Sequence, residues 1–342
     1  MKALVYKGAG VVELEDIEQP VPIDDESLIK IRAVGICGSD FEGFLGKTGR
    51  RTPPMVMGHE IAGTVEIPAA KSRFKKGDTI VVQPKLYCGV CTFCGQGLTN
   101  LCPGAEFFGV MSKNGGMAEY LAVPERCMHR VRQDIEVQKA CLTEPLAVAY
   151  RAAHQVPDNT LRGAEYTVLV GAGTIGLLIL QVIKLRGARN IIVSDMSDYR
   201  LDIAQTLGAD FRINPQKEDF LACIRGITDN KMADIAFEAV GFSASVSQAH
   251  SALKNRGIIV WVGLAQQRIE IDMHRVVTAE LNVRGSFLYS EKDFINSLKL
   301  IETGQIQMDP IITMSVDLVE GAEAFKNLQN NTDGRMIKII LQ

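Results

Sequence analysis

A glycine-rich turn in the middle of the chain constrains the fold more than any other sequence feature. The turn follows the apolar run "YTVLV" and precedes the helical pattern "LLILQVIKLRG". Its residues are Gly171, Gly173 and Gly176, with Thr174 and Ile175 between them. A strand, a glycine turn and a helix in this order let the backbone approach a pyrophosphate, because amide hydrogens and the helix dipole favour anions there. The pattern therefore predicts a dinucleotide site.

Strands and helices continue to alternate after this turn. The apolar run "NIIVSD" ends in Asp195, where a carboxylate accepts hydrogen bonds from the adenosine ribose and repels a 2′-phosphate. NAD is therefore predicted rather than NADP. Arg200 is a further candidate contact near the adenine, with a solvated surface arginine as the alternative. "ADIAFEAVG" and "GIIVWVGL" extend the alternation, which predicts an α/β fold with a doubly wound parallel sheet.

Four of the eight cysteines are clustered in "CGVCTFCGQGLTNLC". The cluster consists of Cys88, Cys91, Cys94 and Cys102, separated by two, two and seven residues. Glycines among them let the chain turn so that four sulfurs converge on a tetrahedral ion. Four thiolates leave no position for water or substrate, and a redox dithiol would need only two of them. The spacing therefore predicts a structural zinc site.

Further candidate ligands are spread along the chain: Cys37 in "GICGSD", His59 and Glu60 in "MGHE", and Glu144 in "LTEPLAVAY". Taken singly, these are ordinary core, turn and cap residues. Their order, "CGSD … GHEIAG … CxxCxxCx7C … EP" followed by the glycine turn, resembles the zinc-dependent medium-chain dehydrogenases along the whole chain. The "EPL" motif resembles the polyol (sorbitol) dehydrogenase-like branch.

The resemblance implies a catalytic zinc held by Cys37 and His59. Alcohol dehydrogenases have a cysteine as the third ligand, whereas this chain has Glu144. In the polyol branch Glu60 can also reach the metal, so which of the two glutamates is the resting ligand stays open. Asp40 matches the position that hydrogen-bonds the ligand histidine and fixes its tautomer. The alternative for Asp40 is a helix N-cap.

The residues for proton transfer differ from the pattern of the family that the chain resembles. Ser39 matches the family hydroxyl that accepts the proton of the alcohol. Many relatives have a histidine where this chain has Glu42, so the relay runs through Glu42, through the ribose and water, or through Glu60. Sorbitol dehydrogenase-like chains have an arginine in place of Leu288, so the far end of the substrate is also open.

The resemblance also implies the domain organisation. A GroES-like β-rich catalytic domain with both zinc sites is expected at residues 1–147 and 285–342, around a Rossmann NAD-binding domain at 148–284. Short strands with Gly, Pro and Asp between them, such as "LIKIRAVG", fit the first of these. The residues expected along the nicotinamide ribose and ring are Val240, Gly241, Val262, Gly263, Leu264, Ser286 and Phe287.

Composition excludes several classes of partner. The 342 residues have a net charge of −3, which gives no electrostatic reason to expect nucleic acid or an anionic membrane. "MKALVYKG" runs directly into a strand-like pattern without a signal peptide, and "IGLLIL" is too short to span a bilayer. A cytoplasmic protein is expected, and the resemblance implies a homodimer or homotetramer.

The predicted function is a zinc-dependent oxidoreductase that transfers a hydride from a secondary hydroxyl of a polyol to NAD, giving a ketose. The first alternative is a polyol-phosphate dehydrogenase of the galactitol-1-phosphate type, with Lys47, Arg50 and Arg51 as phosphate contacts. Butanediol and threonine dehydrogenases share the motifs. A metal-binding member without catalysis is the alternative from another class.

Overall fold

The computed structural model describes residues 1–111 and 113–342, which divide into two compact units. Unit 1 comprises Met1–Glu144, Tyr289–Thr332 and Lys338–Gln342. Unit 2 comprises Pro145–Leu288 and Asp333–Ile337. The limits at 147/148 and 284/285 stay a prediction for the functional domains.

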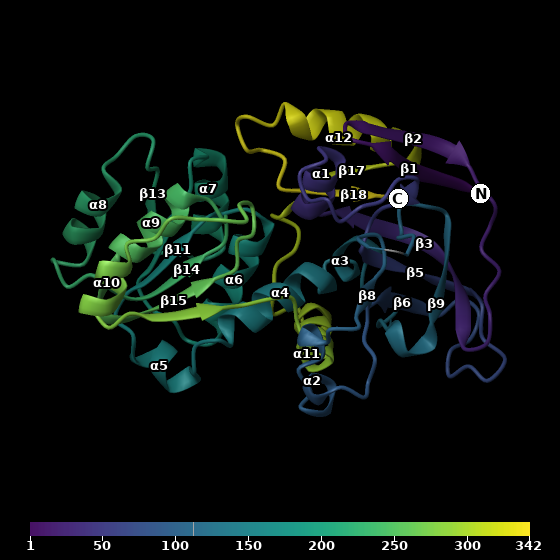
Figure 1. The fold of residues 1–342 in the computed structure, drawn as a ribbon, viewed down its shortest axis with the longest axis horizontal. Helices are drawn as coiled ribbons and strands as arrows, with labels where there is room; N and C mark the ends of the chain where they lie inside the picture. The colour runs from purple at the N-terminus through teal and green to yellow at the C-terminus, as the bar shows by residue number, and fades with distance from the viewer. Residues whose placement is uncertain (112) are drawn as a thin grey trace. The chain divides into compact units, whose positions relative to one another are not determined.

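Unit 1 is built mainly from β-strands (Figure 1). The strands of its seven-stranded sheet are β3 (Glu26–Ile36), β5 (Glu60–Ile67), β6 (Thr79–Val82), β9 (Tyr120–Pro124), β10 (Met128–Arg130), β17 (Ile312–Val316) and β18 (Lys338–Leu341). Its smaller sheets contain β1 (Lys2–Gly8), β2 (Val11–Asp16) and β4 (Met55–Val56), and β7 (Lys85–Leu86) with β8 (Glu106–Phe107).

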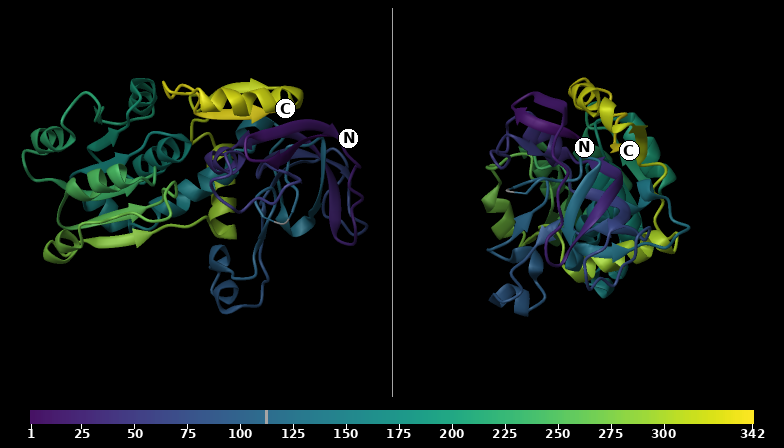
Figure 2. Two further views of the ribbon diagram at one scale, coloured as in Figure 1. Left: turned by 45° about the horizontal axis from the view of Figure 1, so that its top comes forward. Right: turned by 90° about the vertical axis from the view of Figure 1, so that its right-hand side faces the viewer.

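The long strand β3 organises the large sheet. It pairs antiparallel with β5, β9 and β18, and Figure 2 shows the C-terminal segment (yellow) beside the N-terminal strands (purple). Its end lies at the meeting point of distant parts of the sequence, because Gly35 is opposite Glu60 and Ile36 is opposite Ile339. This register brings the residues that follow β3, begin β5 and begin β18 to one place.

Helices of unit 1 are mostly short. They are α1 (Gly38–Phe44), α2 (Thr92–Gly95), α3 (Val137–Ala140), α11 (Glu291–Glu302) and α12 (Gly321–Gln329). The 3₁₀ turns are η1 (Thr99–Leu101), η2 (Glu125–Cys127) and η3 (Leu318–Glu320). Helix α4 (Thr143–Ala153) begins in unit 1 and continues into unit 2.

Unit 2 contains a six-stranded parallel sheet. Its strands are β11 (Thr167–Val170), β12 (Ile191–Ser194), β13 (Phe211–Ile213), β14 (Ala233–Glu238), β15 (Leu253–Trp261) and β16 (Asn282–Gly285). Their order in the sheet is β13-β12-β11-β14-β15-β16. Numbered from β11 as strand 1, this is the Rossmann order 3-2-1-4-5-6. The first strand lies at the centre, with strands 2 and 3 on one side and strands 4 to 6 on the other. The prediction of a doubly wound α/β sheet is confirmed.

Six helices accompany this sheet within the described part of unit 2: α5 (Asp158–Gly163), α6 (Thr174–Leu185), α7 (Asp198–Thr206), α8 (Phe220–Ile227), α9 (Ser243–Ser251) and α10 (Met273–Thr278). Helix α6 packs closely on β11 because Gly176 has no side chain. A Cβ atom added there would lie 1.9 Å from the carbonyl oxygen of Gly171. The glycine turn is therefore a packing requirement as well as a candidate binding element.

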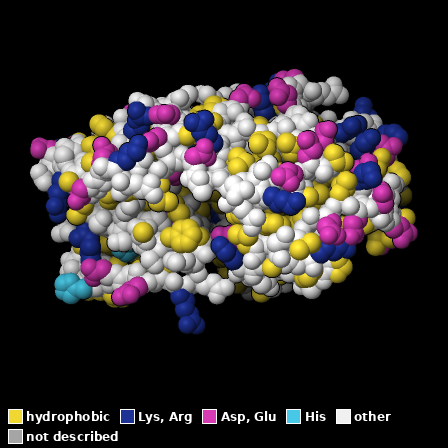
Figure 3. Space-filling model, turned by 90° about the horizontal axis from the view of Figure 1, so that it is seen from above, with side chains coloured by type: hydrophobic (Ala, Val, Ile, Leu, Met, Phe, Trp, Pro, Cys, Tyr) yellow, Lys and Arg dark blue, Asp and Glu magenta, His cyan; other side chains and the backbone are white. Residues whose placement is uncertain are grey.

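One face of the molecule carries both signs of charge. On the face drawn in Figure 3, Lys and Arg side chains are interspersed with Asp and Glu. None of the helices in residues 1–111 and 113–342 is long and apolar enough to cross a membrane.

Gly176→Ala is expected to destabilise unit 2, since the new methyl group meets backbone that cannot move aside. Overpacking of this kind costs about 1–3 kcal/mol, measured as a lower free energy of unfolding in urea. Gly226→Ala is the matched control, because Gly226 lies in α8 with no atom within 4 Å of an added Cβ. It should stabilise the helix slightly. Equal behaviour of the two variants would contradict the packing argument.

Candidate metal centres and dinucleotide site

The four clustered cysteines converge in unit 1. Their sulfur atoms all lie within 4.8 Å of one another, with Cys88 Sγ 3.5 Å from Cys102 Sγ and 4.0 Å from Cys94 Sγ. A tetrahedral zinc ion with Zn–S bonds of 2.3 Å separates its sulfurs by about 3.8 Å. Donor type, number and spacing therefore fit zinc.

The lobe around these thiols has little apolar core. Val90, Phe93 and Leu101 expose 90%, 41% and 41% of their surface. Lys85 is buried on β7. Burial lowers its pKa, although the neighbouring Cys102 and Cys94 act to raise it. Sequence reasoning missed this lysine, whose approach to the thiols depends on how the lobe folds. A metal would tie together a segment that apolar burial alone does not hold.

A second group of possible ligands lies at the end of β3. Cys37, His59 and Glu60 each bring one ligand atom within 4.8 Å of the others. Cys37 is the N-cap of α1, Glu60 begins β5, and His59 directly precedes it. His59 and Glu60 are buried. Residues 22 positions apart thus meet because β3 and β5 are paired in register.

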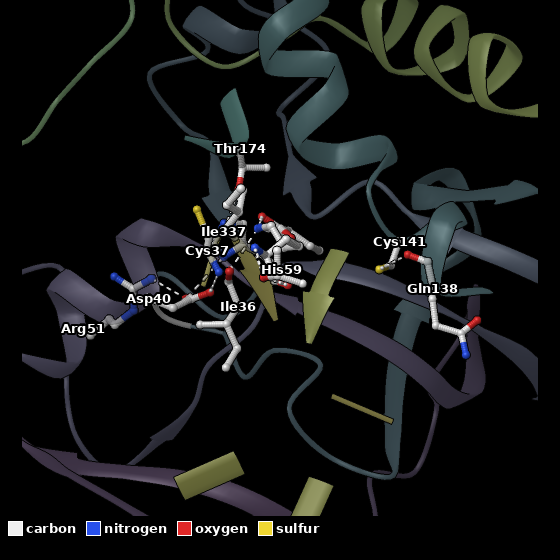
Figure 4. A network of polar contacts seen from close by, with 12 residues as sticks. Ile36, Cys37, Asp40, Arg51, His59, Gln138, Cys141, Thr174 and Ile337 are labelled. Carbon is white, nitrogen blue, oxygen red and sulfur yellow. Dashed lines mark hydrogen bonds and ion pairs between the residues drawn. The ribbon is translucent and has the colours of Figure 1, made fainter. Parts of the chain in front are cut away.

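Asp40 organises the surroundings of this group (Figure 4). It is fully buried, and it accepts a hydrogen bond from the backbone N–H of Cys37 at 3.1 Å. Its Oδ1 lies 2.6 Å from Arg51 Nη2 and 3.4 Å from His59 Nδ1. Burial raises the pKa of Asp40, but the charges of His59 and Arg51 outweigh burial and hold it well below its ordinary value. Asp40 is in the first turn of α1 and not at its N-cap.

The pKa of His59 shows which charge this site favours. Burial lowers it, and the neighbouring Asp40 and Cys37 outweigh burial and raise it well above the ordinary value. The surroundings therefore favour positive charge at the imidazole. A metal ion bound by the neutral imidazole would supply that charge in place of a proton.

Arg51 corrects one expectation from the sequence. It was grouped with Lys47 and Arg50 as a possible phosphate contact, but its side chain is only 1% exposed and is paired with Asp40. Lys47 and Arg50 are exposed. A run of three cations does not reveal which one turns inward, since that depends on a carboxylate 11 residues earlier.

Glu60 has a partner that sequence reasoning missed. Lys338 Nζ donates to both of its carboxylate oxygens, at 2.7 and 2.8 Å, and to the carbonyl of Ile36 at 3.0 Å. Both side chains are buried, with 2% and 0% exposure. Burial lowers the pKa of Lys338, and Glu60 outweighs burial and raises it. No local motif marks Lys338, because β18 brings it from the far end of the chain.

Glu144 is buried in the first turn of α4 but lies outside the group of three close ligand atoms. Burial raises its pKa to about 7, with His59 opposing and Glu60 adding to the rise. The Tyr289 hydroxyl is adjacent, and its pKa is raised well above the ordinary value by burial and by Glu144. Glu144 as a zinc ligand stays a prediction.

The proton-relay candidates lie on α1. Ser39 is half-buried in its first turn. Glu42 is also half-buried, and burial raises its pKa against the charges of Lys47, Arg51 and Arg50. Their relay roles stay predictions.

In unit 2 the predicted dinucleotide residues surround the start of α6. Gly171 has φ +99°, which favours glycine, and Gly173 is the N-cap of α6, with Arg200 Nη1 4.0 Å from the point where its Cβ would be. Asp195 Oδ2 accepts the Ala172 N–H at 2.7 Å, and its Oδ1 accepts the Ser197 N–H at 2.9 Å. The carboxylate is thereby held beside the turn.

The loops after β14 and β15 contact one another. A Cβ added to Gly263 would lie 2.1 Å from the Gly241 nitrogen. Glu238, missed from the sequence, is buried and accepts from the N–H groups of Val240 and Gly241 at 3.0 and 2.7 Å. The remaining predicted residues lie in or after these loops or after β16: Val262, Leu264, Ser286 and Phe287. Their cofactor contacts stay predictions.

Comparisons with known proteins agree with this architecture. Residues 23–133 match the alcohol dehydrogenase GroES-like domain, and residues 174–303 match the zinc-binding dehydrogenase model. D-arabitol-phosphate dehydrogenase of Enterococcus avium is 32% identical over 100% of this chain and 97% of its own length. Sorbitol dehydrogenase of Bacillus subtilis is 30% identical over 96% and 95%.

A solved structure from Sinorhizobium meliloti, described as a zinc-binding dehydrogenase bound to NADP, has a TM-score of 0.90 with 28% identity, covering 99% of this chain and 98% of that one. The chain belongs to the zinc-dependent medium-chain dehydrogenase family, in its polyol dehydrogenase-like branch. It is an oxidoreductase with a GroES-like domain and a Rossmann domain, as predicted.

Arg51→Ala should lower the free energy of unfolding by about 3–5 kcal/mol, because it removes the guanidinium that pairs with the buried carboxylate of Asp40. Arg50→Ala is the control at the adjacent exposed position and should change stability by less than about 0.5 kcal/mol. Urea unfolding of both variants measures the difference. A similar small loss in both would show that Arg51 is not a structural partner.

Cys91→Ser should remove one zinc ion per chain and lower the melting temperature, since a structural site contributes its binding free energy to folding. Cys223→Ser is the control, because Cys223 lies in α8 of unit 2. Metal analysis beside thermal melts tests this. An unchanged zinc count in Cys91→Ser would contradict the assignment.

Proposed function

We propose that the protein oxidises a secondary hydroxyl of a polyol or sugar alcohol to a ketone, with zinc at the Cys37 group and NAD as cofactor. The observation that supports this most is the meeting of one thiol, one imidazole and one carboxylate at Cys37, His59 and Glu60. A single thiolate leaves the metal shell open to substrate, unlike the four-cysteine cluster. Relatives named for sorbitol and arabitol phosphate support the polyol class.

When bound, zinc would supply a Lewis acid that lowers the pKa of a hydroxyl, and NAD would supply the hydride acceptor. Cys37 and His59 would hold the metal, and Asp40 orients the imidazole. In this relay the Ser39 hydroxyl accepts the proton of the substrate hydroxyl as it gives up its own, and the Glu42 carboxylate on the same helix takes that proton toward solvent. Asp40 faces His59 and is paired with Arg51, and we assign it no part in this relay.

NAD is the proposed cofactor because of Asp195. Both oxygens of its carboxylate accept backbone N–H groups, which hold the negative charge beside the glycine turn. A charge in this position accepts hydrogen bonds from ribose hydroxyls and repels a 2′-phosphate. The solved structure from Sinorhizobium meliloti is described as bound to NADP, so the ratio of turnover with NAD and with NADP distinguishes the two cofactors for this chain.

A polyol phosphate is the second candidate substrate. Lys47 and Arg50 are exposed in the loop after α1, and the Enterococcus avium relative is named for arabitol phosphate. With Arg51 committed to Asp40, two cations are left in this loop for a phosphate. An unphosphorylated polyol therefore remains the first choice.

Two further observations support the expected homo-oligomer and the expected cytoplasmic location. Strand β16 is an edge of the parallel sheet, and α10 exposes Met273 and Val277 by 61% and 63%. An open edge beside apolar side chains suits pairing with a second copy, so we expect a homo-oligomer. The cysteines are free, as metal-binding thiols are in the reducing cytoplasm.

Turnover and zinc content measured together test the proposal. The wild-type protein should form NADH with a pentitol or hexitol and contain two zinc ions per chain. Cys37→Ala should lose turnover and one zinc ion while NADH binding persists. Activity only with polyol phosphates would favour the second candidate. Activity with butanediol or threonine, or two zinc ions without any turnover, would overturn the polyol assignment.

Asp195→Ala should reduce the preference for NAD over NADP by about tenfold, which corresponds to about 1.4 kcal/mol. The ratio of kcat/KM values for the two cofactors measures this. Asp198→Ala is the control, because Asp198 is an exposed carboxylate three residues later that pairs with Lys217. An unchanged ratio in Asp195→Ala would count against its ribose role.

A further inference from the structure

A short segment near the C-terminus belongs to unit 2, although the chain on both sides belongs to unit 1. This segment is Asp333–Ile337, preceded by Thr332 and followed by Lys338. Its sequence, "DGRMI", matches no motif. A five-residue excursion needs a reason, because ordering each residue costs about 1–2 kcal/mol of backbone entropy.

Three side chains from the dinucleotide edge donate hydrogen bonds to carbonyl oxygens of this segment. Ser197 Oγ donates to Asp333 at 2.6 Å, and Arg200 Nε donates to Gly334 at 2.8 Å. Thr174 Oγ1, in the first turn of α6, donates to Ile337 at 2.9 Å (Figure 4). The segment is thus bound at both the glycine turn and the loop that follows Asp195.

Gly334 is required at its position for two reasons. Its φ is +73°, a conformation that favours glycine. A Cβ atom there would lie 2.8 Å from Ser197 Cβ and 3.1 Å from Arg200 Nε. Any larger residue would push the Arg200 guanidinium away from the segment.

Arg200 is the residue whose position this contact determines. Its Nε donates to the segment, which leaves the Nη groups for an anion, and a guanidinium binds phosphate oxygens as a fork. Its Nη1 lies 4.0 Å from the point where a Cβ of Gly173 would be, so the guanidinium lies beside the N-cap of α6. Negative charge is favoured there by the helix dipole as well.

We propose that Asp333–Ile337 is a positioning segment for the dinucleotide, in which the Gly334 carbonyl orients Arg200 toward the phosphates of the adenosine diphosphate half. The segment acts through Arg200 and does not touch the reacting nicotinamide. The inference rests on the proposed function, because it takes the glycine turn to be the cofactor site.

Gly334→Ala should weaken binding of NADH and of ADP-ribose by about tenfold, while kcat at saturating cofactor changes little. Arg200→Gln should cause a similar loss. In the Arg200→Gln background, adding Gly334→Ala should cause no further loss, because contacting residues that act as a unit are non-additive. NADH fluorescence and calorimetry with ADP-ribose measure these affinities.

Gly304→Ala is the matched control, since Gly304 has φ +66° but no atom within 4 Å of an added Cβ. It should leave both affinities unchanged. Ser197→Ala removes a neighbouring contact with the segment and should weaken ADP-ribose binding in the same direction if Gly334→Ala does not fold. Unchanged affinity in a folded Gly334→Ala protein, or additive losses in the double variant, would overturn the positioning role alone. A wild-type protein that binds neither ligand would overturn the proposed cofactor function together with it.

Discussion

Two buried ion pairs, Arg51 with Asp40 and Lys338 with Glu60, are the interactions on which the candidate catalytic site depends. Burying a carboxylate costs several kcal/mol, which is recovered only when a cation and further hydrogen bonds are well placed. The chain meets this condition with partners from the loop after α1 and from the last strand. The pairing of β3 with β5 and β18 is therefore a requirement of the site's electrostatics as well as of the sheet.

Much of this architecture could be predicted from the sequence, because the signals are local. Strand, turn and helix around Gly173 are contiguous, and the four cysteines lie within 15 residues, so their spacing constrains their geometry. The parallel sheet follows from alternation of apolar runs and helical patterns. These features do not require knowledge of which distant segments meet.

The residues that sequence reasoning missed are partners brought in by long-range contacts. Lys338 reaches Glu60 across 278 positions, and Lys85 and Glu238 carry no motif of their own. The sequence marks Arg51 as an exposed phosphate contact, but its side chain turns inward to Asp40. A loop cation turns inward only when a buried carboxylate is within reach. The segment around Gly334 is similar, because its importance lies in what its carbonyl groups contact.

Charge balance bears on the question left open by the sequence, which is whether Glu60 or Glu144 is the resting metal ligand. Arg51 neutralises the carboxylate of Asp40, and Lys338 neutralises that of Glu60. The negative charges left for a metal ion are a Cys37 thiolate and the Glu144 carboxylate. Together they balance a divalent ion without net charge in a site whose His59 and Glu144 side chains are buried. If Glu60 replaced Glu144, it would have to leave a cation that holds both of its oxygens, and that buried cation would keep only the neutral carbonyl of Ile36 among its hydrogen-bond partners. Burial also raises the pKa of Glu144 to about 7, a penalty on its charge that a bound cation would remove. On this charge balance we expect Glu144 as the resting ligand and Glu60 as a carboxylate held in place by Lys338, and this assignment stays a prediction.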